Sequence, residues 1–138
     1  DRIDAKDTTL RIVDYKTGGS PKTPANIEQL FTPSESRPNY IFQTFLYAAI
    51  MSRQQSLKVA PSLLYIHRAA SESYSPVIEM GEPRQPKIPV SNFAFFEDEF
   101  REHLQRLLEE IFDKNEPFTQ TEDTKKCAYC DFKAICKR

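Results

Sequence analysis

The spacing of apolar and polar residues predicts a hairpin at the start of the chain. Residues 2–4 and 10–13 have strand character, and the polar run 6–9 between them predicts a turn, so the hairpin covers residues 1–15. Gly18 and Gly19, followed by Ser20 and Pro21, break the strand pattern. We therefore expect a two-stranded unit followed by a loop.

The middle of the chain alternates between helical and strand spacing. A short helix is predicted over residues 25–31. A longer helix is predicted over residues 39–54, because its apolar residues recur on one stripe. Residues 58–67 contain the apolar run 63–66, which is typical of a buried strand, and residues 74–80 predict a further strand.

The strongest helical pattern covers residues 92–113. Ser91 or Asn92 can serve as its N-cap, and Pro117 ends it. We interpret its apolar face as core packing, and that face comprises Phe93, Phe96, Phe100, Leu104, Leu107, Leu108, Ile111 and Phe112. Hairpin, strands and helices together predict an α/β fold with a mixed central sheet flanked by helices.

Charged side chains gather at the open end of the predicted hairpin. If its turn is centred between Asp7 and Thr8, Asp1 lies opposite Asp14 and shares a face with Lys16, whereas Asp4 points to the other face, towards Arg11. Two carboxylates opposed across a strand pair lie about 4.5–5.5 Å apart and repel each other. A bound Mg²⁺ removes this repulsion, and the lysine could then orient an attacking water and offset phosphate charge.

Two alternatives to this metal site stay open on the residues alone. A turn centred on Thr9 would pair Asp4 with Asp14, although it would also place the apolar Leu10 in the turn. The second alternative is an edge hairpin whose aspartates and lysine are solvated surface residues without a catalytic role.

Composition narrows the classes of function. The 138 residues suit one domain or less, and a net charge of -1 argues against a binder of nucleic acid or membranes held by overall charge. Basic residues outnumber acidic ones within residues 15–70 and 125–138, and acidic residues outnumber basic ones within residues 97–116. This distribution indicates either two basic surfaces beside an acidic helix or the ordinary scatter of charge on a folded surface. We see neither a signal peptide nor a run of about 18–20 apolar residues, and expect no membrane partner. Because the chain begins with Asp1, we expect it to be part of a longer protein.

Three cysteines lie close together near the end of the chain. Cys127, Cys130 and Cys136 form a C-x₂-C-x₅-C array, which does not fit an extracellular disulfide framework and favours a cytoplasmic protein. Clustered thiolates suggest metal ligation, by Zn²⁺ or by an iron–sulfur cluster. Either site needs a fourth ligand, which neither His67 nor His103 offers at a useful spacing. Three free thiols are the alternative.

A resemblance to a known family rests on two runs of the hairpin, Asp1-Arg2-Ile3-Asp4 and Ile12-Val13-Asp14-Tyr15-Lys16-Thr17-Gly18. They resemble the metal-binding core of PD-(D/E)XK nucleases and are similar to its RecB-like branch and to AddB-type nuclease domains. The resemblance implies a restriction-endonuclease-like core with Asp1, Asp14 and Lys16 as catalytic residues. It also implies that Asp1, Asp14 and the main-chain carbonyl of Tyr15 bind Mg²⁺ (or Mn²⁺), while the lysine supports the nucleophilic water.

Two further motifs extend the resemblance. Gln43 and Tyr47 share one helix face and resemble the family's Q-x-x-x-Y element, which implies that they help to hold DNA. On spacing alone, a solvated or packed pair is strongly favoured. Cys127, Cys130 and Cys136 resemble three of the four cysteines of the [4Fe–4S] cluster in AddB-type nucleases. The fourth would lie upstream of this chain. The resemblance thus implies a nuclease core over residues 1–124 and a cysteine clip over residues 125–138.

The resemblance implies a Mg²⁺-dependent DNA exonuclease. We expect it to act on single-stranded ends within a helicase–nuclease complex, with a partner subunit, during double-strand-break repair. The alternative is a catalytically inactive DNA-binding or scaffolding module that retains the fold.

Overall fold

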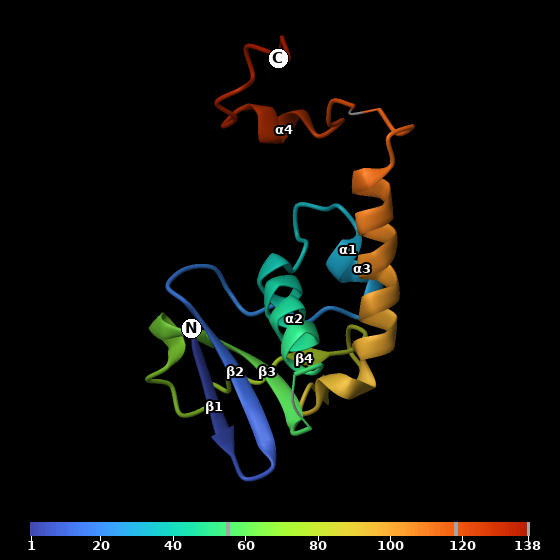
Figure 1. The fold of residues 1–138 in the computed structure, drawn as a ribbon. Coiled ribbons are helices and arrows are strands. Elements are labelled where there is room, and N and C mark those ends of the chain that lie inside the picture. The colour runs from blue at the N-terminus through green and yellow to red at the C-terminus, as the bar shows by residue number, and fades with distance from the viewer. Residues whose placement is uncertain (55, 118, 138) are drawn as a thin grey trace. The chain divides into compact units, whose positions relative to one another are not determined.

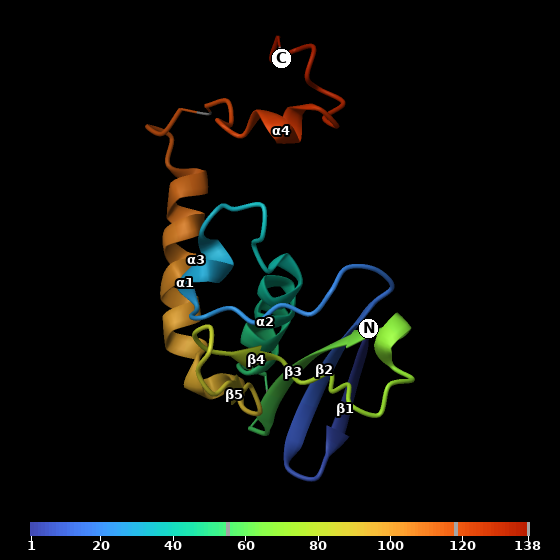
Figure 2. The same cartoon turned by 180° about the vertical axis from the view of Figure 1, so that it is seen from behind.

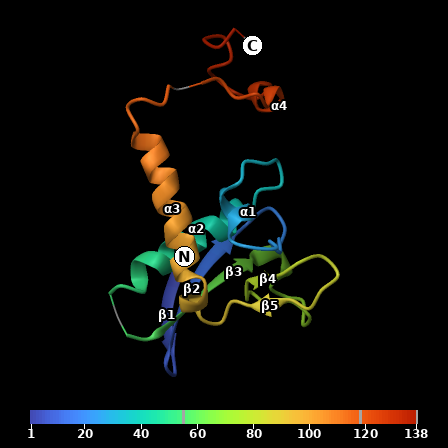
Figure 3. The same cartoon turned by 90° about the vertical axis from the view of Figure 1, so that its right-hand side faces the viewer.

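The hairpin at the start of the chain forms one side of a three-stranded sheet in the computed structural model (Figure 1). β1 (Arg2–Lys6) pairs antiparallel with β2 (Thr9–Lys16), with Ile3 opposite Ile12 and Asp4 opposite Arg11. The register centred between residues 7 and 8 is therefore confirmed. β3 (Lys58–Tyr65) joins β2 in parallel, so the sheet is mixed, as predicted (Figure 3).

The structure describes residues 1–54, 56–117 and 119–137, and the chain divides into two compact units. The first unit, Asp1–Leu107, contains the sheet and its covering helices; the second is Leu108–Arg138. Within the described ranges, no helix is long and apolar enough to cross a membrane.

The first unit is built around α2 (Asn39–Met51), which packs against β2 and β3. Its predicted apolar stripe is buried, because the sheet and the phenylalanines of the later helices cover it: Ile41, Phe45, Ala48 and Ala49 are at most 2% exposed. α1 (Glu28–Phe31) precedes it and is shorter than the helix predicted over 25–31. The chain between β2 and β3 thus supplies the helical crossover that parallel strands need.

The prediction of a strand over residues 74–80 is wrong for most of its length. Among the described residues, β4 (Glu79–Met80) pairs with β5 (Ile88–Pro89) alone (Figure 2), and Val77 forms an isolated bridge with Ser62. The Tyr74 side chain provides the physical reason. Its hydroxyl donates to Leu63 O at 2.7 Å and accepts from Tyr65 N at 2.8 Å, so a side chain occupies backbone groups of β3 that another strand would pair with.

The buried part of β3 also ends earlier than predicted. The apolar run 63–66 was expected to lie within one strand, but β3 stops at Tyr65. The 3₁₀ turn η1 (Ile66–Arg68) follows, and Ile66 is 51% exposed. Because the strand ends at Tyr65, His67 and Arg68 lie in the loop beyond the sheet.

The helix predicted over residues 92–113 is divided near Phe96. A 3₁₀ turn, η2 (Phe93–Phe95), precedes α3 (Glu97–Phe112). Asn92 acts as the cap of that turn, since its Oδ1 accepts from Ala94 N at 3.2 Å. The turn places Phe93 and the helix places Phe100 against Phe45, with ring centroids 5.3 and 5.8 Å from the Phe45 ring.

Only the first half of that apolar face is core. Phe93 and Phe100 are fully buried, whereas Leu108, Ile111 and Phe112 are 44%, 52% and 81% exposed. The interpretation of the whole stripe as core packing is therefore wrong for its last turn and a half. The exposed residues belong to the second unit, which also contains α4 (Thr124–Cys127).

Candidate active site

Asp14 is the most buried charged residue at the carboxyl end of β2, with 1% of its surface exposed. Its Oδ2 lies 2.8 Å from Lys16 Nζ. The Thr44 hydroxyl donates to the same oxygen at 3.5 Å and to Tyr40 O at 2.8 Å. Because a hydroxyl carries a single proton, the shorter bond dominates, and the lysine is the main partner of the aspartate.

Lys16 is held by two elements at once. Besides Asp14, its Nζ donates to Gln43 Oε1 at 2.9 Å and lies 4.4 Å from the centre of the Tyr40 ring. Only 14% of its side chain is exposed. A lysine so enclosed by a carboxylate, an amide oxygen and an aromatic face keeps its charge at a defined position.

The predicted pair on α2 supports this lysine. Gln43 Nε2 donates to the Tyr47 hydroxyl at 2.7 Å, so the two residues share a face as predicted. The bond also fixes the amide so that its oxygen faces Lys16. The structure thus brings Asp14, Lys16, Gln43 and Tyr47 into one chain of contacts that joins the strand to the helix.

Asp1 lies beside this cluster without joining it. Its Oδ1 accepts a hydrogen bond from Tyr15 N at 3.3 Å, which places the carboxylate next to the Asp14–Tyr15 peptide. Across the described residues, no three His, Cys, Asp or Glu side chains converge as a metal site. The donors Asp1, Asp14 and the Tyr15 carbonyl are nevertheless all oxygens, the type that Mg²⁺ prefers, and Mg²⁺ completes its shell with water. The chemistry of this donor set fits Mg²⁺.

Asp4 and Arg11 form a separate ion pair on the other face of the hairpin, as predicted. Arg11 Nε and Nη2 donate to the two oxygens of Asp4 at 2.6 and 2.9 Å, and Arg2 Nη2 lies 2.7 Å away. The hydrogen bonds from Arg11, and the nearby positive charges, lower the pKa of Asp4 below 3.8. This pairing leaves Asp4 outside the candidate active site.

The structure adds Tyr40 and Thr44, which the sequence analysis did not select. Together with Gln43 and Tyr47 they occupy positions i, i+3, i+4 and i+7 of α2. This polar stripe, adjacent to the apolar one, is the signal by which they could have been found. Gly19 explains the position of Tyr40: it has φ of +79°, and a Cβ there would lie 3.0 Å from the ring edge. Only glycine lets the loop approach the ring so closely.

The three cysteines lie in the second unit and are free and partly exposed. Turns separate them, with Cys130 N donating to Cys127 O at 3.2 Å and Cys136 N donating to Phe132 O at 3.4 Å. In the first unit, His103 stacks on Phe31 with ring centroids 5.2 Å apart.

Comparison with known proteins yields a family match. A family model described as the PD-(D/E)XK nuclease superfamily matches residues 1–137. No curated protein and no solved structure matches the chain significantly. The matched range includes every residue of the Asp14–Lys16 cluster and all three cysteines.

Proposed function

Because the chain belongs to the PD-(D/E)XK nuclease superfamily, we propose that it is a Mg²⁺- or Mn²⁺-dependent DNA exonuclease acting on single-stranded ends. The observation that carries the proposal is the buried contact between Asp14 Oδ2 and Lys16 Nζ at 2.8 Å, held by Gln43. Burying a charge costs free energy unless a partner charge and hydrogen bonds offset it, and such pairs cluster at functional sites. Here the pair stands at the carboxyl end of a strand, with Asp1 beside it.

The proposed metal ligands are Asp1, Asp14 and the main-chain carbonyl of Tyr15. A bound Mg²⁺ supplies a nucleophilic water and positive charge against the phosphate oxygens. The bond from Tyr15 N to Asp1 Oδ1 joins the Asp1 carboxylate to the residue whose carbonyl is the third proposed ligand. Asp14 is oriented by Lys16 on one of its two oxygens, which leaves the other for a cation.

The proposed role of Lys16 is to stabilise negative charge on the phosphate and to orient the attacking water. Its ammonium has three protons, and the structure uses two of them towards Asp14 and Gln43. The third can donate to a water or phosphate oxygen. Gln43 and Tyr47 act as positioning residues, because their mutual hydrogen bond fixes the amide that contacts the lysine.

Further parts of the proposal concern the protein to which the chain belongs. We place it in a RecB- or AddB-like helicase–nuclease that works with a partner subunit in cytoplasmic double-strand-break repair. Residues 1–124 would form the nuclease core and residues 125–138 a clip. Cys127, Cys130 and Cys136 would bind a [4Fe–4S] cluster with a fourth cysteine outside this chain. The order of the motifs and the C-x₂-C-x₅-C spacing support this assignment.

A second candidate function is a DNA-binding or scaffolding module without catalysis. The position of Asp1 favours it, since its carboxylate bonds to the backbone of Tyr15 and the described residues contain no converged three-ligand metal site. Such a module would bind single-stranded DNA without degrading it.

A nuclease assay separates the two functions. We expect the full-length protein to degrade single-stranded DNA with Mg²⁺ and to lose this activity in EDTA. Lys16→Ala should lower kcat by about 10²–10³-fold, the usual loss when one electrostatic group of an active site is removed. Lys6→Ala is the matched control, because this exposed lysine ends β1 at the far side of the hairpin.

The outcome decides between nuclease and scaffold. Equal degradation by Lys16→Ala and Lys6→Ala would show that the lysine has no catalytic role. Binding of single-stranded DNA without any Mg²⁺- or Mn²⁺-dependent cleavage by the wild-type protein would establish the scaffolding function instead.

A further inference from the structure

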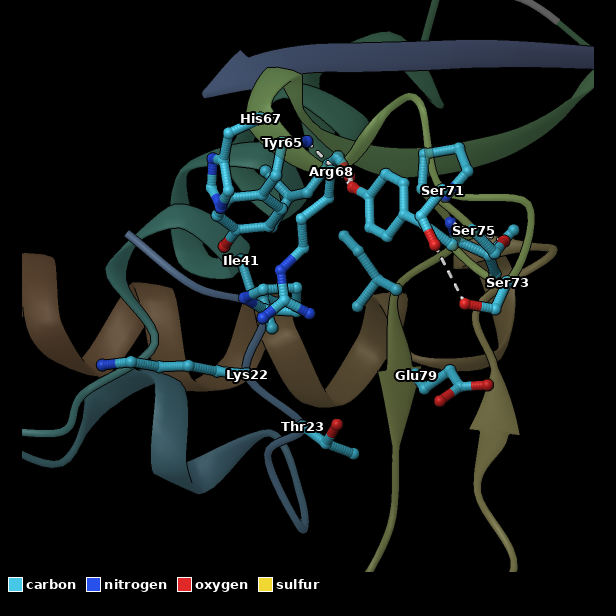
Figure 4. Close-up of a pocket in the computed structure, with 16 residues that line it drawn as sticks. Lys22, Thr23, Ile41, Tyr65, His67, Arg68, Ser71, Ser73, Ser75 and Glu79 are labelled. Atoms are coloured by element: carbon cyan, nitrogen blue, oxygen red, sulfur yellow. Dashed lines mark hydrogen bonds between the residues drawn. The ribbon is translucent and has the colours of Figure 1, made fainter. Parts of the chain in front are cut away.

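A cavity of about 480 Å³ opens at the carboxyl end of β3 (Figure 4). Its polar lining comes from two distant segments, the loop after β3 and the chain after β2, and includes Lys22, His67, Arg68, Ser71, Ser73 and Ser75. Figure 4 shows Arg68 extending into the cavity from that loop. Among the described residues that line it, Glu79 is the one carboxylate, so the lining is cationic.

The positive charges of this cavity are not cancelled within the protein. The Lys22 ammonium donates to two neutral carbonyls, Ser36 O at 2.8 Å and Arg37 O at 3.1 Å, which leaves its charge in place. Within the described part of the chain, Arg68 has no ion pair. Lys22 extends away from Arg68 (Figure 4), so Arg68 is the cation that points into the cavity. A guanidinium and several hydroxyls around one space form a site for an anion with many acceptor oxygens.

The cavity adjoins the candidate active site through a line of aromatic rings. β2 and β3 are parallel and Lys16 pairs with Tyr65, so both strands end at the same edge of the sheet. The Tyr40 ring, which faces Lys16, lies 6.4 Å from the Tyr65 ring, and the His67 ring lies 6.0 Å from the Tyr65 ring. A second cavity of about 290 Å³ shares Lys22, Tyr65 and Ile41 with the first and includes Tyr40. The two cavities thus share part of their lining, and they are bordered by Tyr40, whose ring faces Lys16, and by Arg68.

The loop that carries Arg68 is anchored by specific bonds. The Tyr74 hydroxyl links it to Leu63 O and Tyr65 N on β3, and Leu63 N donates to Pro76 O at 2.8 Å. Ser71 N donates to Arg68 O at 3.0 Å, which closes the turn between them. The backbone that carries Arg68 and the serines is thus held in place by bonds within the protein.

We propose that this cavity binds a phosphodiester of the single-stranded nucleic acid substrate, a few nucleotides from the one cleaved at Lys16. This inference rests on the proposed nuclease function and names a subsite of it. Arginine, lysine and serine donors contact phosphate oxygens without reading sequence. Aromatic rings beside a cationic groove are the usual means of holding single strands. The exposed rings of Tyr40 and His67, on either side of the buried Tyr65, are available for stacking, and Arg68 supplies the charge.

Binding in EDTA tests the subsite independently of catalysis. The probe is a fluorescein-labelled oligothymidylate of roughly 16 nucleotides, long enough to cover a site of the largest usual size. Its anisotropy is titrated with the full-length protein at several salt concentrations. We expect Arg68→Ala to raise the Kd roughly tenfold and to reduce the salt slope by about 0.7 for each phosphate that the protein no longer neutralises. The control is Arg53→Ala, an exposed arginine after the opposite end of α2.

Hydrolysis of a short substrate separates the subsite from the active site. Bis(p-nitrophenyl) phosphate is too small to span both, so Arg68→Ala should leave its kcat/KM unchanged while Lys16→Ala lowers it. Unchanged thermal unfolding midpoints for both arginine variants would establish that they fold.

The outcomes distinguish the inference from the function it rests on. Equal binding by Arg68→Ala and Arg53→Ala would overturn the subsite, while Mg²⁺-dependent cleavage by the wild type would leave the nuclease function intact. Arg68-dependent binding of inorganic phosphate without an Arg68 effect on the oligonucleotide would identify a free-phosphate site and also overturn the inference. If the oligonucleotide binds in an Arg68-dependent way but the protein never cleaves it, the result would support the phosphodiester subsite and refute the proposed nuclease activity.

Discussion

Two aspartates of the hairpin differ because their side chains lie on opposite faces of one ladder. Asp14 is buried against Lys16 and Gln43, whereas Asp4 lies at a partly exposed position between Arg2 and Arg11. Side-chain alternation alone decides this separation. Asp14 is therefore available for chemistry beneath α2, whereas Asp4 stabilises the hairpin.

Stability in acid should depend on Asp4. Because Arg11 lowers the pKa of this carboxyl in the folded protein below 3.8, its contribution is present above pH 3.8 and is lost as pH falls through the lowered value. Asp4→Asn should therefore have a lower urea midpoint than the wild type at neutral pH, and the two should converge at strongly acidic pH. Asp131→Asn, a change in the exposed tail, is the control. A constant difference between wild type and Asp4→Asn at every pH would contradict this.

At the scale of elements, α2 serves both the core and the site. Its apolar stripe packs on the phenylalanines that η2 and α3 supply, and the neighbouring polar stripe holds Lys16. Phe100 is central to this packing, since it is fully buried and its ring lies 5.3 Å from Phe31 and 5.8 Å from Phe45. Any loosening of this cluster would move the helix that positions Gln43.

We expect Phe100→Ala to lower the free energy of unfolding by about 3–5 kcal/mol, because it removes a buried ring and leaves a cavity. Phe95→Ala is the matched control: that ring is 81% exposed, and its loss should change stability by less than about 0.5 kcal/mol. Urea denaturation followed by tyrosine fluorescence or circular dichroism measures both. Similar midpoints for the two variants would show that the aromatic cluster does not govern stability.

At the scale of the whole molecule, the two units differ in how their residues are buried. The first unit contains every buried residue of the described chain, and the described residues of 108–137 are all partly or fully exposed. Segments with few buried contacts open at little free-energy cost. The cysteines therefore lie in the part of the chain with the fewest buried contacts. A bound metal would stabilise this part the most.

Limited trypsin digestion should cut the second unit first. We expect the earliest cleavages after Lys114, Lys125 and Lys126, which are exposed, and a longer-lived product that retains residues 1–107. Mass spectrometry of the early products identifies the sites. Initial cleavage within residues 1–107 would contradict this order.

The same digestion addresses the proposed cluster. Anaerobic reconstitution of the full-length protein with iron and sulfide should slow cleavage after Lys125 and Lys126, because ligation ties their neighbourhood together. Cys127→Ser should abolish the protection. Identical digestion with and without iron would argue that the three thiols remain free.

The order of the residues determined those features that depend on neighbours along the chain. Alternation along a strand and the polar run 6–9 were enough to set the hairpin register and to separate Asp14 from Asp4. Helical spacing was enough for the buried stripe of α2 and for the contact between Gln43 and Tyr47. Local spacing predicts these features because each joins residues within one hairpin or one helix.

Tertiary structure alone decided the contacts between elements. The bond from Lys16 to Gln43 joins a strand to a helix, and the Tyr74 hydroxyl replaces a strand that residues 74–80 were expected to form. The cavity likewise combines Lys22 with Arg68. Periodicity contains no information on which distant segments meet, since that choice depends on how the sheet, the helices and their side chains fill one core. The sequence therefore determined which residues could do chemistry, and the fold determined which of them lie together.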